Sequence, residues 1–332
     1  MRTITEILKE ALSNTRSKVA VKLNEMAAVP GTKKDVNGDE KLIEKIGALR
    51  GKGSHEERFN RASNDPNHHL HPKNYTHAGS NEDGPRRGGG DVTDHETYRN
   101  TGRALARALD TIGKKDKKVA AMYKSGKYTV KRAGATAAKV NPAYASLGGR
   151  NSTSRADIEI SSHDGKHVRR ISVKQGSAQL ASAEGGEFRA LGHHAAESVT
   201  KNEGKRKEIK SSIDKISSLQ KAAKTTSDPK KHAKQISDAN RIWNSVRTAH
   251  PKIEHHIAHE AAFGHHKFGE GNAGSADHMV TYNPSTGESK VTNPGDEIKV
   301  KKMEIRKGKG KTGSRANPKA RKQRDHAFRI DI

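Results

Sequence analysis

The chain of 332 residues contains no cysteine, and only 4% of its residues are aromatic and 30% hydrophobic. The absence of cysteine excludes disulfides and thiolate metal sites. Globular proteins are usually about 45–50% apolar, so a single core spanning the whole chain is not expected and part of the length should be disordered. No apolar run is long enough to cross a bilayer, and we expect no membrane contact.

Positive charge is what the chain has in excess. It carries 64 lysines and arginines against 38 aspartates and glutamates, which gives a formal net charge of +26. Repulsion among so many like charges opposes compaction unless a polyanion lies nearby. A modest net charge already keeps a protein in solution, so the excess predicts a polyanionic partner. Nucleic-acid phosphates are the usual one, and we expect DNA.

Periodicity and turn signals divide the chain into three regions. Residues 1–25 place Ile4, Ile7 and Leu8 at helical spacing and predict a short amphipathic helix. Residues 26–92 lose this periodicity and predict a mostly disordered, basic, histidine-rich arm, with one helix candidate at 40–50. Residues 93–332 hold the remaining helix and strand signals. We expect them to form the folded domain, with a basic C-terminal segment.

The clearest strand signals predict a hairpin over residues 156–174. Residues 156–160 alternate between apolar and polar, the turn ends in Asp164-Gly165, and residues 168–174 return as a second strand. Further strands are expected at 128–130, at 278–282 and 298–305 on either side of the turn 283–287, and at the end of the chain. A long helical region at 203–248 carries an apolar stripe made of Ile209, Ile213, Ile216 and Leu219.

The predicted hairpin brings a carboxylate and a lysine together. Asp157 lies on its first strand and Lys174 at the end of its second. Divalent-metal nucleases need a carboxylate to hold Mg²⁺ and a lysine to orient the attacking water or to stabilise charge at the phosphate. The alternative is an ordinary surface hairpin in which Lys174 is solvated and Asp157 pairs with Arg155 or Arg169.

At these residues the sequence resembles the PD-(D/E)XK, or restriction-endonuclease-like, nuclease superfamily. The stretch Ser154-Arg155-Ala156-Asp157-Ile158-Glu159-Ile160, followed by Ile171-Ser172-Val173-Lys174, is similar to members whose motif is S-x-K. The resemblance implies an α/β fold with a mixed sheet flanked by helices. It also implies Mg²⁺-dependent hydrolysis of DNA phosphodiesters, with Asp157 as a metal ligand and Lys174 as the catalytic lysine.

The sequence departs from the family pattern at the second acidic position, where Ser172 stands. Some members of the family supply this carboxylate from the following helix. By that resemblance Glu187 is the expected second metal ligand and catalytic residue, with Glu184 as the alternative. A further acid from an earlier helix, Glu96, is also a candidate.

The basic C-terminal segment is expected to bind DNA. Almost no aromatic residue interrupts it, so we expect contacts to phosphates rather than stacking on bases. The residues that we expect to bind nucleic acid are Lys301, Lys302, Arg306, Lys307, Lys309, Lys311, Arg315 and Arg321. Among the 19 histidines, His255 and His259 have a spacing that can ligate zinc, but no second-shell pattern accompanies them.

The N-terminus has a resemblance of its own. Residues 1–11, Met-Arg-Thr-Ile-Thr-Glu-Ile-Leu-Lys-Glu-Ala, resemble the capsid-targeting peptide of internal head proteins in large tailed bacteriophages. There a prohead protease cuts after a hydrophobic-x-Glu triplet, which implies cleavage between Glu10 and Ala11. Leu23-Asn24-Glu25 offers a second such triplet, with cleavage before Met26. A frayed amphipathic helix without such a role is the alternative.

Together these features predict a phage DNA-binding protein with a restriction-endonuclease-like domain. The expected activity is Mg²⁺-dependent cleavage of DNA, and the expected location is the interior of the virion head, the host cytoplasm, or both. The expected partners are DNA, the prohead protease and the capsid core. A non-enzymatic internal head protein that neutralises packaged DNA is the alternative function, and a scaffold component of the prohead core is a third.

Overall fold

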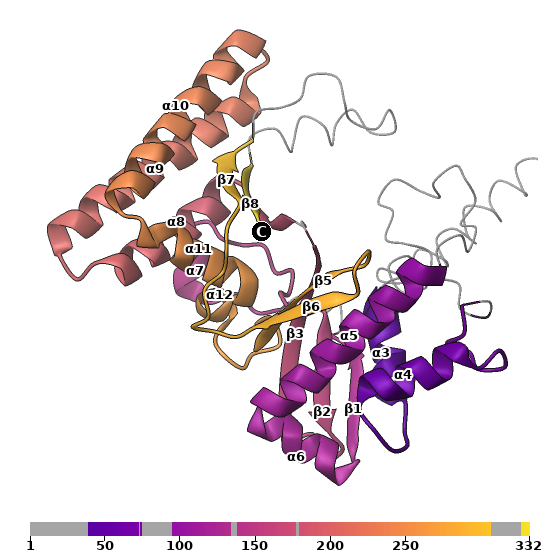
Figure 1. Ribbon diagram of the computed structural model, residues 1–332. Coiled ribbons are helices and arrows are strands. Elements are labelled where there is room, and N and C mark those ends of the chain that lie inside the picture. Colours follow the sequence, from indigo (N-terminus) through magenta and orange to yellow (C-terminus); the bar gives the residue numbers. More distant parts are fainter. Residues whose placement is uncertain (1–38, 73, 75–94, 134–137, 177–178, 307–326) are drawn as a thin grey trace, which may run out of the picture.

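The computed structural model describes residues 39–72, 74, 95–133, 138–176, 179–306 and 327–332. Within these residues the protein is a mixed α/β structure with a five-stranded and a three-stranded sheet, both flanked by helices (Figure 1). The larger sheet has the strand order β1-β2-β3-β5-β6 and the smaller one the order β4-β8-β7. The strands are β1 Tyr128–Arg132, β2 Ile158–Ser162, β3 Val168–Gln175, β4 Gln179–Ala183, β5 His278–Asn283, β6 Glu288–Thr292, β7 Lys302–Ile305 and β8 Phe328–Asp331.

The predicted hairpin forms the centre of the larger sheet. β2 and β3 pair in antiparallel fashion with Ile158 opposite Ile171, and Gly165 supplies the positive φ of +69° that their turn requires. β5 runs parallel to β3, whereas β1 and β6 pair in antiparallel fashion with β2 and β5 at the two edges. The strands predicted near 128–130, near 278–282 and at the end of the chain are therefore confirmed.

The strand predicted at 298–305 is only partly correct. The turn after β5 leads into β6, and the chain reaches β7 only at Lys302. β7 then joins β8 in the smaller sheet rather than pairing with β5. The observed strand is therefore shorter than the predicted one, and it lies in the smaller sheet.

Four helices cover one face of the larger sheet. They are α3 Asp39–Ala48, α4 His55–Asn64, α5 His95–Lys115 and α6 Lys117–Ser125. α5 carries a broad apolar face whose Leu105 and Leu109 are fully buried. These leucines belong to one core with Ile158, Ile160 and Ile171 of the sheet.

The helix candidate at 40–50 is confirmed by α3, but the expectation of a mostly disordered arm at 26–92 is wrong for residues 39–72. Leu42, Ile43 and Ile46 of α3 and Phe59 of α4 are fully buried in the core that lies against the sheet. A Cβ on Gly102 of α5 would come within 2.0 Å of the Phe59 ring, so the close approach of the two helices requires glycine there. The folded domain therefore begins well before residue 93. The rest of the arm and residues 1–25 lie outside the described residues.

A second core lies between the smaller sheet and the remaining helices. These are α7 Pro142–Ser146, α8 Gly185–Val199, α9 Glu203–Thr225, α10 Pro229–Ala249, α11 Lys252–Phe263 and α12 His265–Phe268. α9 and α10 form a helical hairpin that projects away from the α3–α6 side of the molecule (Figure 1). The predicted stripe holds, because Ile209, Ile213 and Ile216 are buried and Leu219 is partly buried.

Candidate functional site

The two faces of the larger sheet differ in chemistry. Successive side chains of a strand point to opposite faces, so the isoleucines of β2 and β3 lie against α3 and α5 while their neighbours lie on the other face. That second face is mostly polar along both strands. Its side chains, including the residue that precedes β2, are Asp157, Glu159, Ser161, Val168, Arg170, Ser172 and Lys174.

The hairpin brings Asp157 and Lys174 into contact at its open end. The Lys174 Nζ lies 3.3 Å from Oδ2 of Asp157, and each side chain is 24% exposed. The backbone N–H of Val173 donates to the same Oδ2 at 2.6 Å. This bond fixes the carboxylate against the strand and holds it next to the lysine, so the Asp157–Lys174 pair is both ordered and partly open to solvent.

Ser172 supports Asp157 directly. Its hydroxyl lies 3.3 Å from the same Oδ2, and the residue is only 1% exposed. The position at which the family pattern has a second acid is therefore a buried hydroxyl that donates to the first acid. One carboxylate, rather than two, lies beside Lys174 on the hairpin.

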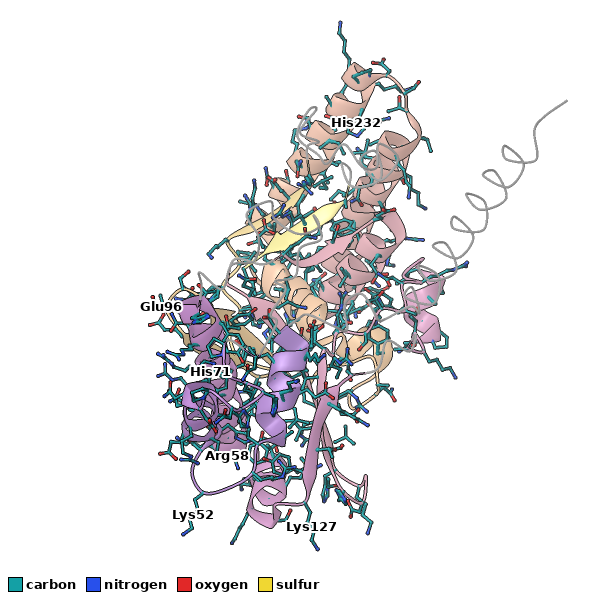
Figure 2. All side chains as sticks on the ribbon, turned by 90° about the vertical axis from the view of Figure 1, so that its right-hand side faces the viewer. Lys52, Arg58, His71, Glu96, Lys127 and His232 are labelled. Atoms are coloured by element: carbon teal, nitrogen blue, oxygen red, sulfur yellow. The ribbon has the colours of Figure 1, made fainter. Side chains whose placement is uncertain are left out.

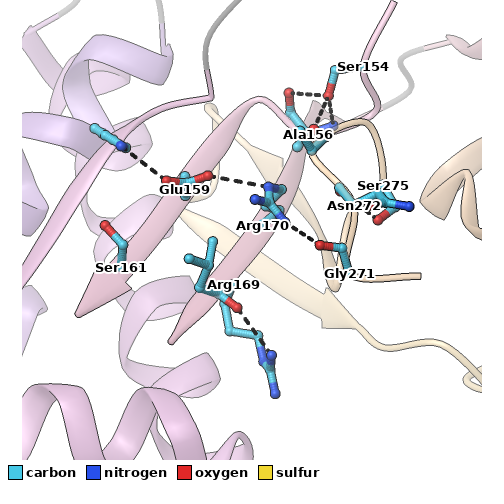
Figure 3. Close-up of polar contacts among 12 residues, drawn as sticks. Ser154, Ala156, Glu159, Ser161, Arg169, Arg170, Gly271, Asn272 and Ser275 are labelled. Atoms are coloured by element: carbon cyan, nitrogen blue, oxygen red, sulfur yellow. Dashed lines mark hydrogen bonds and ion pairs between the residues drawn. The ribbon is translucent and has the colours of Figure 1, made fainter. Parts of the chain in front are cut away.

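A second acid on this face was missed by the sequence reasoning. Glu159 follows Asp157 by two residues and forms ion pairs with Lys131 at 3.1 Å and with Arg170 at 3.3 Å. Arg170 also donates to the carbonyl of Gly271 at 2.8 Å, so the polar face is tied to the loop before β5 (Figure 3). The alternation Asp157-Ile158-Glu159-Ile160 was the available signal, since it places both acids on one face.

Glu187, the expected second metal ligand, belongs to another cluster. Its carboxylate forms an ion pair with Lys267 of α12, and both side chains are buried. Burial and the nearby Glu187 raise the pKa of the Tyr144 hydroxyl. Asp157 instead bonds to Ser172, Val173 and Lys174. The two carboxylates that were expected to share a metal thus have separate sets of partners.

The two other candidate metal ligands, Glu184 and Glu96, have surroundings of their own. Glu184 forms an exposed ion pair with Lys224 of α9 at 2.6 Å. Glu96 lies in the first turn of α5, which packs on the apolar face of the sheet, and it is exposed at the surface of the molecule (Figure 2).

The histidines of α8, α11 and α12 form pairs. The ring of His255 lies 4.3 Å from that of His259, and His194 stacks on His266 at 3.9 Å. Burial lowers the pKa of His194 to about 4. In the part of the chain that the structure describes, no three His, Asp or Glu side chains lie together as a metal-binding group. The expected spacing of His255 and His259 is therefore realised without a third ligand.

Three of the predicted DNA-binding residues lie in or beside β7. Lys301 and Lys302 are exposed, with Lys302 paired to Glu304 at 2.9 Å, and the backbone N–H of Arg306 donates to Ala327 at 3.0 Å. Lys307, Lys309, Lys311, Arg315 and Arg321 lie outside the described residues, as do Glu10 and Ala11.

Among the described residues no helix is long and apolar enough to cross a membrane. Comparisons of the chain with protein-family models, with curated proteins and with solved structures found no match.

Proposed function

We propose that this protein binds DNA and hydrolyses its phosphodiester bonds with Mg²⁺ at the Asp157–Lys174 pair. The observation that carries the proposal is the contact of these two side chains at the open, partly exposed end of one hairpin. In metal-dependent cleavage of a phosphodiester a carboxylate can hold the metal and a lysine can offset the charge that develops at the phosphate, and this pair supplies both groups. The net charge of +26 supplies the attraction for the polyanionic substrate.

A restriction-endonuclease-like fold is part of the proposal. Two features support it: the mixed five-stranded sheet with flanking helices, and the position of the motif residues on its central strands. Asp157 directly precedes β2, and Ser172 and Lys174 alternate on the same face of β3.

Asp157 fits the role of a Mg²⁺ ligand. All of the bonds that its carboxylate accepts from the described residues go to Oδ2, so Oδ1 accepts none of them. Mg²⁺ is commonly held by one or two carboxylates together with waters and substrate phosphates, so one carboxylate is a sufficient protein contribution. Glu187 is not assigned as the second, because its buried carboxylate contacts Lys267 of α12 rather than Lys174.

Lys174 and the backbone orient the carboxylate and stabilise the charge that develops during the reaction. The bound metal would polarise the phosphate and its attached water. The Val173 N–H keeps the Asp157 carboxylate in place, so its orientation does not depend on the substrate. Lys174, held beside that carboxylate, donates to the attacking water or to a phosphate oxygen and offsets the charge that develops there.

The test is the conversion of supercoiled plasmid to the nicked form by purified protein and Mg²⁺. Asp157→Asn and Lys174→Ala are each expected to lower the nicking rate on the order of 100-fold or more, because each removes a group that contacts the reacting atoms. Thermal melting of the variants checks that they are folded.

The same hairpin offers matched controls at its other end. Asp164 and Lys166 form an exposed pair at 3.9 Å in the β2–β3 turn. Asp164→Asn and Lys166→Ala should nick at the wild-type rate. Wild-type nicking by folded Asp157→Asn, or DNA binding without nicking in any divalent metal, would refute the catalytic proposal.

One observation favours a second candidate, an internal head protein that binds packaged DNA without cutting it. Ser172 leaves a single carboxylate beside Lys174 on the hairpin. In that case purified virions should contain the protein, with mass spectrometry finding a chain that starts at Ala11 or Met26, while plasmid nicking is absent. Absence of the protein from virions, or an intact Met1 terminus in them, would count against this candidate.

A further inference from the structure

The side of α10 that faces away from the core carries basic and small polar side chains. Its inner side buries Ile236, Ala239, Trp243 and Val246. The exposed residues recur every three or four positions and so form one stripe along the helix. We call this stripe the outer face of α10; it consists of Lys230, Lys234, Ser237, Arg241, Asn244, Ser245 and Thr248.

The positive charge of this face is largely unneutralised. The hairpin segment 203–249 holds twelve lysines and arginines against five acids. On α9, four of the basic side chains each contact a glutamate; they are Arg206, Lys207, Lys210 and Lys224. On α10, Lys230 and Lys234 form no ion pair with any described residue, and Arg241 has only Asp238 at 3.4 Å. On α9, Lys205, Lys215 and Lys221 are likewise exposed and without an ion pair to a described residue. Both helices therefore present free positive charge, and on α10 Lys230 and Lys234 share one stripe with Arg241.

The composition of the outer face matches a phosphate backbone. Proteins contact DNA phosphates through Lys, Arg, Ser, Thr and Asn side chains, the types present here. No aromatic ring lies on this face, because Trp243 is fully buried, so stacking on unpaired bases is not available. The 21 residues of α10 span about 30 Å, close to the roughly 34 Å of one duplex turn. The partner that fits is duplex rather than single-stranded DNA.

Strand β7 is anchored beside the same helix. The Asn240 side chain donates to the carbonyl of Ile305 and accepts its N–H, both at 2.8 Å. The next residue, Arg306, is hydrogen-bonded to Ala327 at 3.0 Å. β7, with the exposed Lys301 and Lys302 at its start, is therefore held beside α10.

We infer that the outer face of α10 is a duplex-binding surface that holds the phosphate backbone, distinct from the Asp157–Lys174 pair. The inference rests on the DNA binding proposed above and assigns part of that binding to a helix which the hairpin motif does not include. α10 lies apart from β2 and β3, the strands that carry that pair (Figure 1). Binding at α10 and cleavage at the β2–β3 hairpin are therefore separable by mutation.

The test measures binding of a fluorescein-labelled 30-base-pair duplex by anisotropy, in EDTA so that no cleavage occurs, over a range of NaCl concentrations. The variant carries Lys230→Gln, Lys234→Gln and Arg241→Gln in the full chain. Loss of three phosphate contacts should make the slope of log affinity against log salt shallower by about 2–3 and weaken binding about tenfold or more at physiological salt. These side chains are exposed, so the melting temperature should not change.

The matched control removes the same charge elsewhere. Lys118, Lys124 and Lys127 are exposed and form no ion pair with a described residue. Lys127 lies at the opposite end of the molecule from His232 of α10 (Figure 2). The triple glutamine variant at these positions should keep nearly the wild-type slope and affinity.

Each other outcome identifies what has failed. Wild-type binding by the α10 variant, or equal weakening by the control, overturns the assignment to α10 and leaves the proposed function standing. Tight binding of a 30-mer single strand with no binding of the duplex overturns the duplex assignment. If the wild-type chain binds neither DNA at low salt, the proposed function itself has failed.

Discussion

Lys267→Met is expected to lower the free energy of unfolding by about 3–5 kcal/mol, because it leaves a buried carboxylate without its counter-charge. Lys267 is 1% exposed and its ammonium forms an ion pair with Glu187, which is itself buried. The carboxylate of Glu260, 4% exposed, also interacts with this ammonium. The measurement is urea denaturation of wild type and variant at neutral pH.

A double variant separates the cost of a broken pair from the value of the pair itself. Replacing both charges, with Lys267→Met and Glu187→Leu together, should recover most of the lost stability, since apolar side chains often substitute for a buried pair at little cost. The exposed pair of Lys224 with Glu184 is the control. Lys224→Met should cost about 1 kcal/mol or less.

This experiment also decides the role of Glu187. If the carboxylate is structural, Glu187→Gln should lower stability and leave the Mg²⁺ concentration needed for nicking unchanged. An equal and small effect of Lys267→Met and Lys224→Met would contradict the buried-pair account. A higher Mg²⁺ requirement in a fully stable Glu187→Gln variant would return Glu187 to the metal site.

The contact of Asp157 with Lys174 could be predicted from the sequence because it is local. An Asp-Gly turn fixes the register of the hairpin, and the register sets which side chains share a face. The contact of Glu187 with Lys267 could not be predicted, for the opposite reason. Its partner, Lys267, lies 80 residues away along the chain, and no local pattern in α8 indicates it.

Apart from the helix candidate at 40–50, which α3 confirms, the folding of residues 39–72 was missed because apolar residues there are sparse and turn residues are frequent. Two signals mark the helices of this region. Leu42, Ile43 and Ile46 have helical spacing, and Ser54 with Glu57 forms a capping box at the start of α4. Helices as short as α3 and α4 are marginal alone, so their stability comes from burial against α5 and β1. β6 was missed because its sequence, Glu-Ser-Lys-Val-Thr, is mostly polar and it lies at a sheet edge.

Asp110→Asn tests the docking of α4 most directly. The Asp110 carboxylate, on α5, accepts the backbone N–H groups of His55 at 2.8 Å and of Glu56 at 3.1 Å, and it also binds Nδ1 of His55 at 2.8 Å. The other ring nitrogen of His55 lies 3.1 Å from the Tyr128 hydroxyl. An asparagine cannot accept on both of its side-chain atoms. The variant should therefore lose about 2–3 kcal/mol of stability, as expected for hydrogen bonds to a charged group.

The stability that Asp110→Asn loses should depend on pH. Burial alone would raise the pKa of Asp110, but hydrogen bonds from the His55 side chain and from the N–H groups of His55 and Glu56 outweigh it and hold the pKa below its usual value. A lowered folded-state pKa stabilises the protein above the unfolded pKa of about 3.9, and this contribution is lost as the pH falls through the folded value. The stability difference between wild type and Asp110→Asn should thus be largest at pH 6–7, about two to three units above that pKa, and should shrink towards pH 3, about one unit below it.

The control for this series is Asp65→Asn at the other end of α4, where the Asp65 side chain is exposed and accepts only the N–H of Asn67 among the described residues. An asparagine can still accept that bond, so the urea midpoint should match that of wild type throughout the pH range. A constant difference between wild type and Asp110→Asn from pH 7 to pH 3 would show that the charge of Asp110 is not what holds α4. Equal urea midpoints of wild type and Asp110→Asn at pH 7 would show that the packing of α4 on α5 does not depend on Asp110.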